Sequence, residues 1–346
     1  MPESDRLNQD APSLFTEPVA LAYLSGMEHL EGAVLVLGED QILLTDPRYM
    51  EEARARFPGQ VRSLTGSLGE ALREIALELN IEAIRFEGEM PYWKGLSLIA
   101  ALEESGVRIE GAEGLLRNRR MVKSLKEQEL IRKSAEITDS IFAEALKYIG
   151  PGIRERELCR RMEISILENQ GEGSSFPLMA LFGSAASKPH GTPGNQALEW
   201  GMPALLDIGA RYGGYASDMT RMLALGDPGA DFRNDYSFLL ELQREASDMV
   251  KPGAAAVEIH DFVSRSLTKA GFQVLHSTGH GVGLEVHEAP FLGKASKDIL
   301  EPGMVLTIEP GIYLPGRYGM RIEDLVLVTP TGCEVLSNTS KELIIL

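Results

Sequence analysis

The stretch Leu205-Leu-Asp-Ile-Gly-Ala-Arg-Tyr-Gly-Gly-Tyr-Ala-Ser-Asp-Met-Thr-Arg221 predicts a β-hairpin. Runs rich in branched and aromatic residues flank Gly213-Gly214, a pair suited to a two-residue turn with positive φ. With the turn there, Asp207 faces Thr220 across the two strands. Asp218 lies two residues from Thr220, so it shares a face of the sheet with Asp207. Two acids on one face fit either a solvated surface or a shared metal site, and this stretch alone leaves both open.

A second hairpin candidate runs from Met304 to Asp324 and carries acids in the same arrangement. A turn centred on Gly316 sets Glu309 directly opposite Glu323. Four carboxylates that point to one spot raise one another's pKa, and a buried cluster of this kind needs cations to neutralise it. The two hairpins together therefore favour a metal site over a solvated surface.

The segment between the hairpins, from His276 to Pro290, offers three histidines, and its glycines let the backbone come close to a site. One imidazole added to four carboxylates is a mostly hard set of ligands. Such a set suits two divalent ions such as manganese, cobalt or zinc better than a structural zinc site, which favours cysteine. We therefore expect a centre with two divalent ions, and manganese is the first candidate.

These motifs resemble those of the Xaa-Pro peptidases (prolidases and aminopeptidases P), within the larger family of pita-bread metallopeptidases. The shared motifs are Asp207-Ile-Gly, Ser217-Asp-Met-Thr-Arg221, Gly279-His-Gly-Val-Gly-Leu284, His287-Glu-Ala-Pro290, Glu309-Pro-Gly-Ile-Tyr313 and Arg321-Ile-Glu-Asp324. They cover roughly residues 175 to 330. The resemblance implies five metal ligands, which are Asp207, Asp218, His280, Glu309 and Glu323. It further implies that Asp218 and Glu323 bridge both ions.

The resemblance implies metal-assisted hydrolysis of a peptide bond and gives roles to further side chains. Glu309 is expected to act as the general base for the attacking water, beside its role as a ligand. His287 is expected to stabilise the oxyanion together with the metal, and His190 is a catalytic-site histidine that handles protons. Positions around the substrate are implied for His276, Tyr313 and Arg321. Structural or surface roles are expected for His29, His260, Tyr215 and Arg221.

The length of the substrate is a separate question within this family, because prolidases cleave Xaa-Pro dipeptides and aminopeptidases P take longer chains. A dipeptide ends in a carboxylate close to the scissile bond, so a dipeptidase gains from an arginine there. Arg321 is one candidate. Arg48 is the other, and its alternative is a surface residue at the start of a helix. We expect a dipeptidase that acts on small peptides with proline at the second position, because the chain is compact and carries one amino-terminal domain.

Other classes of function stay open at this point. Some pita-bread relatives have lost catalysis and serve as binding modules, but those lack the ligands. A creatinase-like, metal-free C–N hydrolase would also lose the acids. A methionine aminopeptidase would usually lack an amino-terminal domain of this size. Metal content separates the first two alternatives from a metallopeptidase, and a panel of peptides separates the third.

The chain of 346 residues is long enough for two domains. We expect an amino-terminal α/β domain, similar to that of creatinase, over residues 1–117, a linker over 118–123 and an α+β pita-bread catalytic domain over 124–346. In the first domain we expect strands at 33–38, 41–45, 81–86 and 107–110 and helices at 49–57, 67–79 and 93–104. Ser124 and Glu127 form a capping box that begins a long helix ending near Tyr148, and a second helix runs from Glu155 to Gln170.

The composition disfavours some classes of binding partner for this chain. Its net charge of −17 makes it a poor candidate for binding nucleic acid or an anionic membrane surface. No apolar run approaches the length of a membrane span, and the start lacks the pattern of a signal peptide. Two cysteines are too few for a disulfide framework. We therefore expect a cytoplasmic protein, with a homodimer as its assembly.

Overall fold

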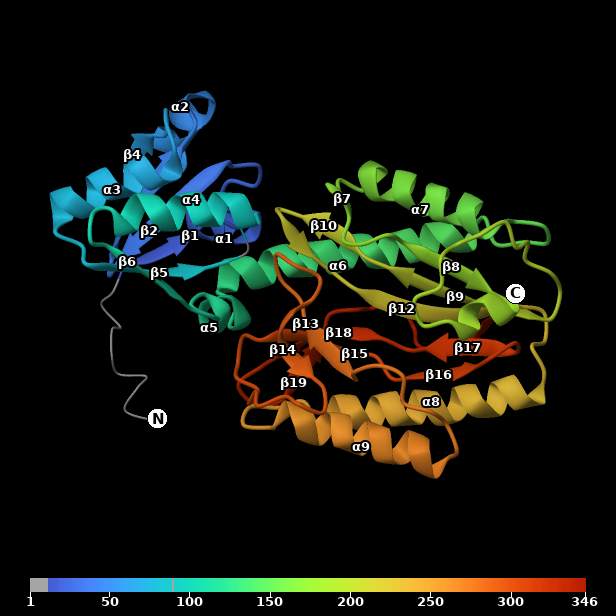
Figure 1. Cartoon of the computed structure of the whole chain (residues 1–346). Coiled ribbons are helices and arrows are strands. Elements are labelled where there is room, and N and C mark those ends of the chain that lie inside the picture. Colours follow the sequence, from blue (N-terminus) through green and yellow to red (C-terminus); the bar gives the residue numbers. More distant parts are fainter. Residues whose placement is uncertain (1–11, 89) are drawn as a thin grey trace. The chain divides into compact units, whose positions relative to one another are not determined.

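The computed structural model describes residues 12–88 and 90–346, so the first eleven residues of the expected amino-terminal domain lie outside the described part. The chain divides into two compact units, Met1–Asn118 and Arg119–Leu346, which are described separately below (Figure 1). The expected linker at 118–123 stays a prediction. In the structure, a short helix, α5 (Arg117–Met121), occupies most of it.

The amino-terminal unit is built on one six-stranded sheet with helices packed against it. Its strand order is β4-β3-β2-β1-β5-β6. The strands are β1 (Ser13–Phe15), β2 (Gly32–Leu37), β3 (Asp40–Thr45), β4 (Gln60–Ser63), β5 (Ala83–Glu87) and β6 (Arg108–Gly111). The helices are α1 (Pro18–Ser25), α2 (Met50–Arg56), α3 (Leu68–Leu79) and α4 (Tyr92–Glu103), with a 3-10 turn at η2 (Pro47–Tyr49). Each strand and helix predicted for this unit from the sequence is present within two residues of its expected bounds.

Helix α3 illustrates how local sequence forms this unit. Ser67 caps the helix by accepting a hydrogen bond from the backbone of Glu70, whose side chain bonds back to the cap. The helix then places Leu72 and Ile75, one turn apart, in the core with Leu35 of β2. The amphipathic spacing in the sequence therefore decides which face of α3 meets the sheet.

The second unit begins with two helices, α6 (Leu125–Leu146) and α7 (Glu155–Glu168). Ser124 caps α6 through the predicted capping box with Glu127. Two more helices follow later in the chain, α8 (Ala230–Asp248) and α9 (Ala256–Lys269). Figure 1 shows these two pairs on opposite sides of the strands of this unit. No helix within residues 12–88 and 90–346 has both the length and the apolar character to span a membrane.

Four small sheets lie between the helix pairs. Their orders are β20-β12-β9-β8, β11-β10-β7, β14-β13-β15-β18-β19 and β16-β17. The strands of the first half are β7 (Gly173–Ser174), β8 (Met179–Phe182), β9 (Met202–Ile208), β10 (Ala210–Tyr212), β11 (Tyr215–Ala216) and β12 (Met219–Leu225), with a 3-10 turn at η3 (Gly183–Ser187). Those of the second half are β13 (Gly279–Gly281), β14 (Glu288–Leu292), β15 (Val305–Ile308), β16 (Gly311–Leu314), β17 (Tyr318–Arg321), β18 (Asp324–Val328), β19 (Cys333–Val335) and β20 (Ile344–Ile345).

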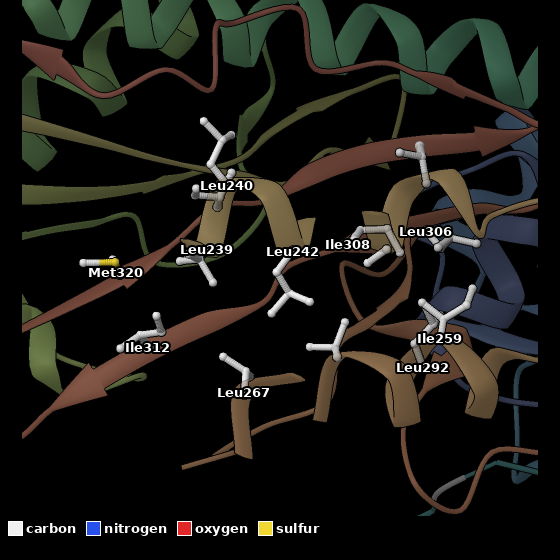
Figure 2. Packing of buried hydrophobic residues seen from close by; sticks show 14 of the residues in the cluster. Leu239, Leu240, Leu242, Ile259, Leu267, Leu292, Leu306, Ile308, Ile312 and Met320 are labelled. Carbon is white, nitrogen blue, oxygen red and sulfur yellow. The ribbon is translucent and has the colours of Figure 1, made fainter. Parts of the chain in front are cut away.

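Alternation along the strands divides the core into two layers. On β9, Ala204 and Leu206 pack with α6 and α7, whereas Leu205 points to the other side and packs with α8 and α9. Figure 2 shows part of that second layer, which includes Leu239 of α8 and Ile308 of β15. A sheet buried on both faces leaves few places for polar side chains, and the predicted ligands Asp207 and Asp218 lie near strand ends.

The predicted registers of both hairpins are confirmed. Thr220 pairs with Asp207, and Gly213 and Gly214 turn the chain between β10 and β11 with φ of 57° and 78°. In the second hairpin, Ile308 pairs with Asp324 and Gly311 pairs with Arg321. Glu309 and Glu323 therefore lie opposite each other, in the gap where one ladder ends and the next begins.

Candidate metal centre and active site

The five side chains predicted as metal ligands come together in one cavity of about 620 Å³. They arrive from three separate parts of the second unit. Asp207 lies on β9 and Asp218 directly before β12, His280 lies on β13, and Glu309 and Glu323 lie in the gap of the second hairpin. Each register places the acids of its own hairpin together, and the fold brings both hairpins to the same cavity.

The donor set fits a divalent cation. One ligand atom from each of Asp218, His280 and Glu323 lies within 4.8 Å of the other two. The Nε2 atom of His280 is 3.6 Å from Oδ2 of Asp218 and 3.4 Å from Oε1 of Glu309. Oδ1 of Asp207 and Oδ1 of Asp218 are buried and find no hydrogen-bond donor among the described residues. Buried carboxylate oxygens without donors are costly unless a cation meets them.

Burial and mutual repulsion raise the pKa of three carboxyl groups in this cluster. The pKa values of Asp218 and Glu309 lie well above the ordinary range because both groups are buried and because Glu323 is close by. Burial and the neighbouring Asp207 raise the pKa of Glu323 to about 7. Without a cation these groups therefore hold their protons to a higher pH than ordinary carboxyl groups do, and a bound cation would displace the protons.

His280 has the opposite shift, which also suits metal binding. Burial, and then the nearby ring of His287, lower the pKa of His280 to about 3. Its ring is therefore neutral at physiological pH and has a lone pair to offer to a metal.

Arg321 and Thr220 orient the acids by hydrogen bonds to Glu323 and Asp207. The Oγ1 atom of Thr220 donates to Oε2 of Glu323 at 2.6 Å and accepts from Nε of Arg321 at 2.9 Å. The other guanidinium nitrogens of Arg321 donate to Oδ2 of Asp207 and, at 2.9 Å, to the hydroxyl of Tyr313. All three nitrogens of this buried guanidinium are engaged, so a substrate carboxylate would have to displace one of these partners.

A second buried arginine, Arg221, holds the backbone of the second hairpin. Its guanidinium donates to the carbonyl oxygens of Glu323 and Thr339 and forms an ion pair of 2.7 Å with Asp324. Asp324 also accepts from Lys341 at 2.7 Å. The expected structural role of Arg221 thus has a specific form, because it fixes the residue that carries a predicted ligand.

His276 is held rigidly near the ligand cluster. Its Nδ1 atom lies 2.7 Å from the carbonyl oxygen of Ser277, and its Nε2 atom lies 3.0 Å from the hydroxyl of Tyr313. Burial, and then the charge of Arg321, lower the pKa of His276 to about 4. His276 is therefore a neutral, oriented hydrogen-bonding group at the wall of the cavity.

His190 and His287 line the same cavity with exposed side chains. The ring of His287 packs edge-on against that of His280, with 4.3 Å between the centroids. His260, for which a structural role was expected, lies within hydrogen-bond distance of Thr278 and Ser264.

Arg48 belongs to the amino-terminal unit, and its partners there are carboxylates. Its guanidinium pairs with Asp46 at 2.8 Å and with Glu31 at 3.1 Å, and its side chain is 68% exposed. It lies in the 3-10 turn before α2, which agrees with the alternative of a surface residue at a helix start. Its predicted role in binding substrate stays a prediction.

The sequence analysis does not identify several of the side chains that orient the predicted ligands. Thr220 and Asp324 were visible only as neighbours of predicted ligands within the shared motifs. Gln243, which donates to Asp324 at 3.0 Å, and Lys341 gave no sequence signal, because they lie far from the motifs along the chain.

Comparison with known proteins agrees with this geometry. Residues 129–330 match the family described as Metallopeptidase family M24, and residues 9–122 match the Creatinase/Prolidase N-terminal domain. The chain is 34% identical over 333 residues to an Xaa-Pro dipeptidase of Pyrococcus furiosus, with 95% of this chain and 93% of that protein covered.

Two solved structures extend the agreement to the whole fold. An Xaa-Pro dipeptidase from Bacillus anthracis has a TM-score of 0.92 at 34% identity and covers 97% of this chain and 95% of its own. An X-Pro aminopeptidase from Thermotoga maritima has a TM-score of 0.90 at 28% identity and covers 99% of both chains. The predicted architecture, an α/β amino-terminal domain before an α+β catalytic domain, is confirmed. The chain belongs to metallopeptidase family M24.

Proposed function

We propose that this enzyme hydrolyses the peptide bond before proline in Xaa-Pro dipeptides, with two divalent ions bound by Asp207, Asp218, His280, Glu309 and Glu323. The observation that carries the proposal is the convergence of these side chains around buried carboxylate oxygens that lack donors. The similarity to Xaa-Pro dipeptidases along almost the whole chain supports the choice of substrate. Manganese is the first candidate for the ions, with cobalt and zinc as alternatives.

The bound ions would supply Lewis-acid activation of water and of the peptide carbonyl. Glu309 accepts the proton of the attacking water, because its carboxylate lines the cavity beside the other predicted ligands. His287 donates a hydrogen bond to the carbonyl oxygen as charge develops there. Burial lowers the pKa of His287, so the neutral ring acts as a donor and does not repel the cations.

The remaining side chains of the cavity orient the substrate. His276 is fixed by Ser277 and Tyr313, so it presents one constant hydrogen-bonding geometry to a peptide. His190 approaches from the loop after η3 and handles the proton of the leaving nitrogen. Arg321 acts on the substrate through Tyr313 and Asp207, since its nitrogens are all engaged.

An aminopeptidase P that takes longer Xaa-Pro peptides is the second candidate. Two observations favour it. The structure of the X-Pro aminopeptidase covers 99% of this chain. Arg321, the cation expected to bind the carboxylate of a dipeptide, already forms an ion pair with Asp207. Arg48 is the other proposed carboxylate ligand, and a substrate would compete there with Asp46 and Glu31.

One assay separates these functions. The protein is loaded with manganese, and release of the free amino-terminal residue is measured from an Xaa-Pro dipeptide, an Xaa-Pro-Xaa tripeptide and an Xaa-Ala dipeptide. We expect the Xaa-Pro dipeptide to have the highest kcat/KM and the Xaa-Ala dipeptide to be a poor substrate. Preference for the tripeptide would establish the second candidate instead, and cleavage of neither proline peptide would refute both.

The proposal includes a homodimer in the cytoplasm, with no nucleic acid or membrane as partner. The acidic net charge of −17 disfavours nucleic acid and anionic membranes as partners, and the unpaired cysteines Cys159 and Cys333 fit a reducing compartment. Sedimentation of the purified protein at micromolar concentration tests the dimer directly.

A further inference from the structure

A buried cluster of charges lies outside the predicted ligand set, and Glu288 is its centre. Oε1 of Glu288 lies 2.9 Å from Nζ of Lys123, and Oε2 accepts a hydrogen bond of 2.6 Å from Arg120. Arg120 also pairs with Glu285 at 2.7 Å. Arg120 lies on α5 and Lys123 lies between α5 and α6, whereas Glu285 lies in the loop before β14 and Glu288 is the first residue of that strand. We call Arg120, Lys123 and Glu288 the Glu288 clasp.

Lys123, one of the two cations of the clasp, is buried and is fixed by hydrogen bonds of its backbone. The side chain of Lys123 is 1% exposed, and burial lowers its pKa. Its backbone N–H donates to the carbonyl of Gly303 at 2.9 Å, and its carbonyl accepts from the side chain of Gln128 at 2.8 Å. A buried ammonium group with one carboxylate partner makes that partner hard to move, because separating them leaves a charge in the protein interior.

The backbone of the loop before β14 leaves room for the carboxylate of Glu288 and helps to hold it in place. A Cβ atom at Gly283 would come within 2.4 Å of Oε1 of Glu288, so the carboxylate lies where only glycine leaves room. Glu288 Oε2 also accepts a long hydrogen bond of 3.4 Å from the backbone of Glu285. The clasp and these contacts together determine the path of residues 283–288.

His287 lies within this path and depends on it. Its ring makes no hydrogen bond to any residue in the described part of the chain, and its close ring contact there is with His280. Apart from this packing against His280, the ring is positioned through its own backbone. The backbone of His287 is bonded directly to Glu288, which the clasp holds.

We propose that Lys123 and Arg120 are positioning residues for His287 and act on it through Glu288. This inference rests on the proposed function, in which His287 donates to the carbonyl oxygen of the substrate. The clasp sets the distance from His287 to the reacting carbonyl, and a shift of about 1 Å in such a group can lower a rate by up to about a hundredfold. The segment that precedes α6 thereby takes part in catalysis without touching the substrate.

A double-mutant cycle tests the inference in the manganese-loaded, full-length protein. Lys123→Met removes the ammonium but keeps the length of the side chain. We expect it to lower kcat about tenfold or more and to change KM less than about twofold. In the background of His287→Ala, the same substitution should lower kcat by less than about twofold, because the residue through which it acts is gone. An equal loss in both backgrounds would show a general structural effect and overturn the proposal.

Two further variants keep the test decisive if Lys123→Met folds poorly. Glu288→Gln retains the shape of the clasp, and we expect it to follow Lys123→Met in both backgrounds. Glu285→Gln is the matched control, since Glu285 bonds the same arginine but its side chain is 48% exposed. It should lower kcat by less than about twofold, and a loss equal to that of Glu288→Gln would also overturn the proposal.

A readout without substrate separates this inference from the proposed function. The imidazole resonances of His287 in the manganese-free protein, assigned with His287→Ala, should move in Lys123→Met and Glu288→Gln but stay in place in Glu285→Gln. Unchanged resonances would refute the clasp as a positioning device. Moved resonances in a protein that cleaves no proline peptide would uphold the positioning of His287 and refute the proposed function alone.

Discussion

Thr220 donates a hydrogen bond of 2.6 Å to Glu323, and it thereby joins the first acidic hairpin to the second. The hydroxyl does this while it accepts a bond from Arg321, so one small side chain links two buried ionic groups. Because the contact spans 103 residues along the chain, it forms only when both hairpins are in place.

This contact leads to a prediction for Thr220→Val. Valine keeps the shape but removes the hydroxyl that pairs with Oε2 of Glu323 and with Nε of Arg321, and each unsatisfied buried group costs about 1–3 kcal/mol. We expect a lower free energy of unfolding in urea and weaker manganese binding. Thr220→Ser keeps the hydroxyl and serves as the control. Equal stability of the serine and valine variants would contradict this role.

The predicted bridging ligands give a second test. Asp218→Ala and Glu323→Ala should each abolish activity and lower the bound metal, because removal of a shared carboxylate leaves two cations without a common counter-charge. Elemental analysis and turnover of an Xaa-Pro dipeptide measure both effects. Asp231→Ala, which removes an exposed acid paired with Arg317, is the control and should change neither. Normal turnover with stoichiometric metal in either ligand variant would show that the assignment is wrong.

The two exposed histidines should behave differently from the ligands. We expect His190→Ala and His287→Ala to keep their metal and to lose about a hundredfold or more in kcat/KM, the scale for a positioned acid, base or oxyanion donor. Metal content and kinetics are measured on the same samples. Loss of metal together with activity would instead make these histidines ligands or structural supports.

The raised pKa of Glu323 predicts how the metal-free protein responds to pH. Its folded pKa of about 7 exceeds the ordinary value of 4.5, so folding favours the protonated carboxyl. The resulting stability is fully present below pH 4.5 and is lost as the pH rises to about 7. Asp218 and Glu309 shift in the same direction.

Thermal unfolding of chelator-treated protein between pH 4.5 and pH 8 measures this effect. We expect the Tm to fall across the range, with the decline reduced in Glu323→Gln and reversed by added manganese. A Tm that rises with pH in the metal-free protein would be incompatible with buried, repelling carboxyl groups.

Selectivity for peptide length tests Arg48. If Arg48 binds the carboxylate of a dipeptide, Arg48→Ala should lose the preference for Xaa-Pro over Xaa-Pro-Xaa while still cleaving the tripeptide. Arg62→Ala is the matched control, because Arg62 also pairs with an acid, Glu78, in the same unit. Unchanged selectivity in Arg48→Ala would remove this residue from the substrate site.

The ligand cluster could be predicted from the sequence because its geometry is local. The positions of Gly213-Gly214 and Gly316 set the two registers, and register decides which acids share a face. Once both hairpins exist, Asp207, Asp218 and Glu323 have little freedom to lie elsewhere.

The groups that support the cluster could not be predicted in this way. Arg221 reaches Thr339 across 118 residues, and Arg120 reaches Glu288 across 168. Periodicity says nothing about such contacts, which depend on how whole elements pack. The helices α8 and α9 were also missed, although the spacing of Phe232, Tyr236 and Leu239 on α8 is amphipathic and was available as a signal.

The bond from Arg221 to Thr339 has a consequence for how the enzyme is made. The partners of Arg221 and Asp324 include Thr339 and Lys341, which the ribosome adds after every predicted ligand has been synthesised. A nascent chain that has not yet reached these residues leaves Arg221 without two of its hydrogen bonds and Asp324 with one cation fewer. The support of the second acidic hairpin by Arg221 is therefore completed late in biosynthesis, and we expect removal of this segment to weaken that support without removing a predicted ligand.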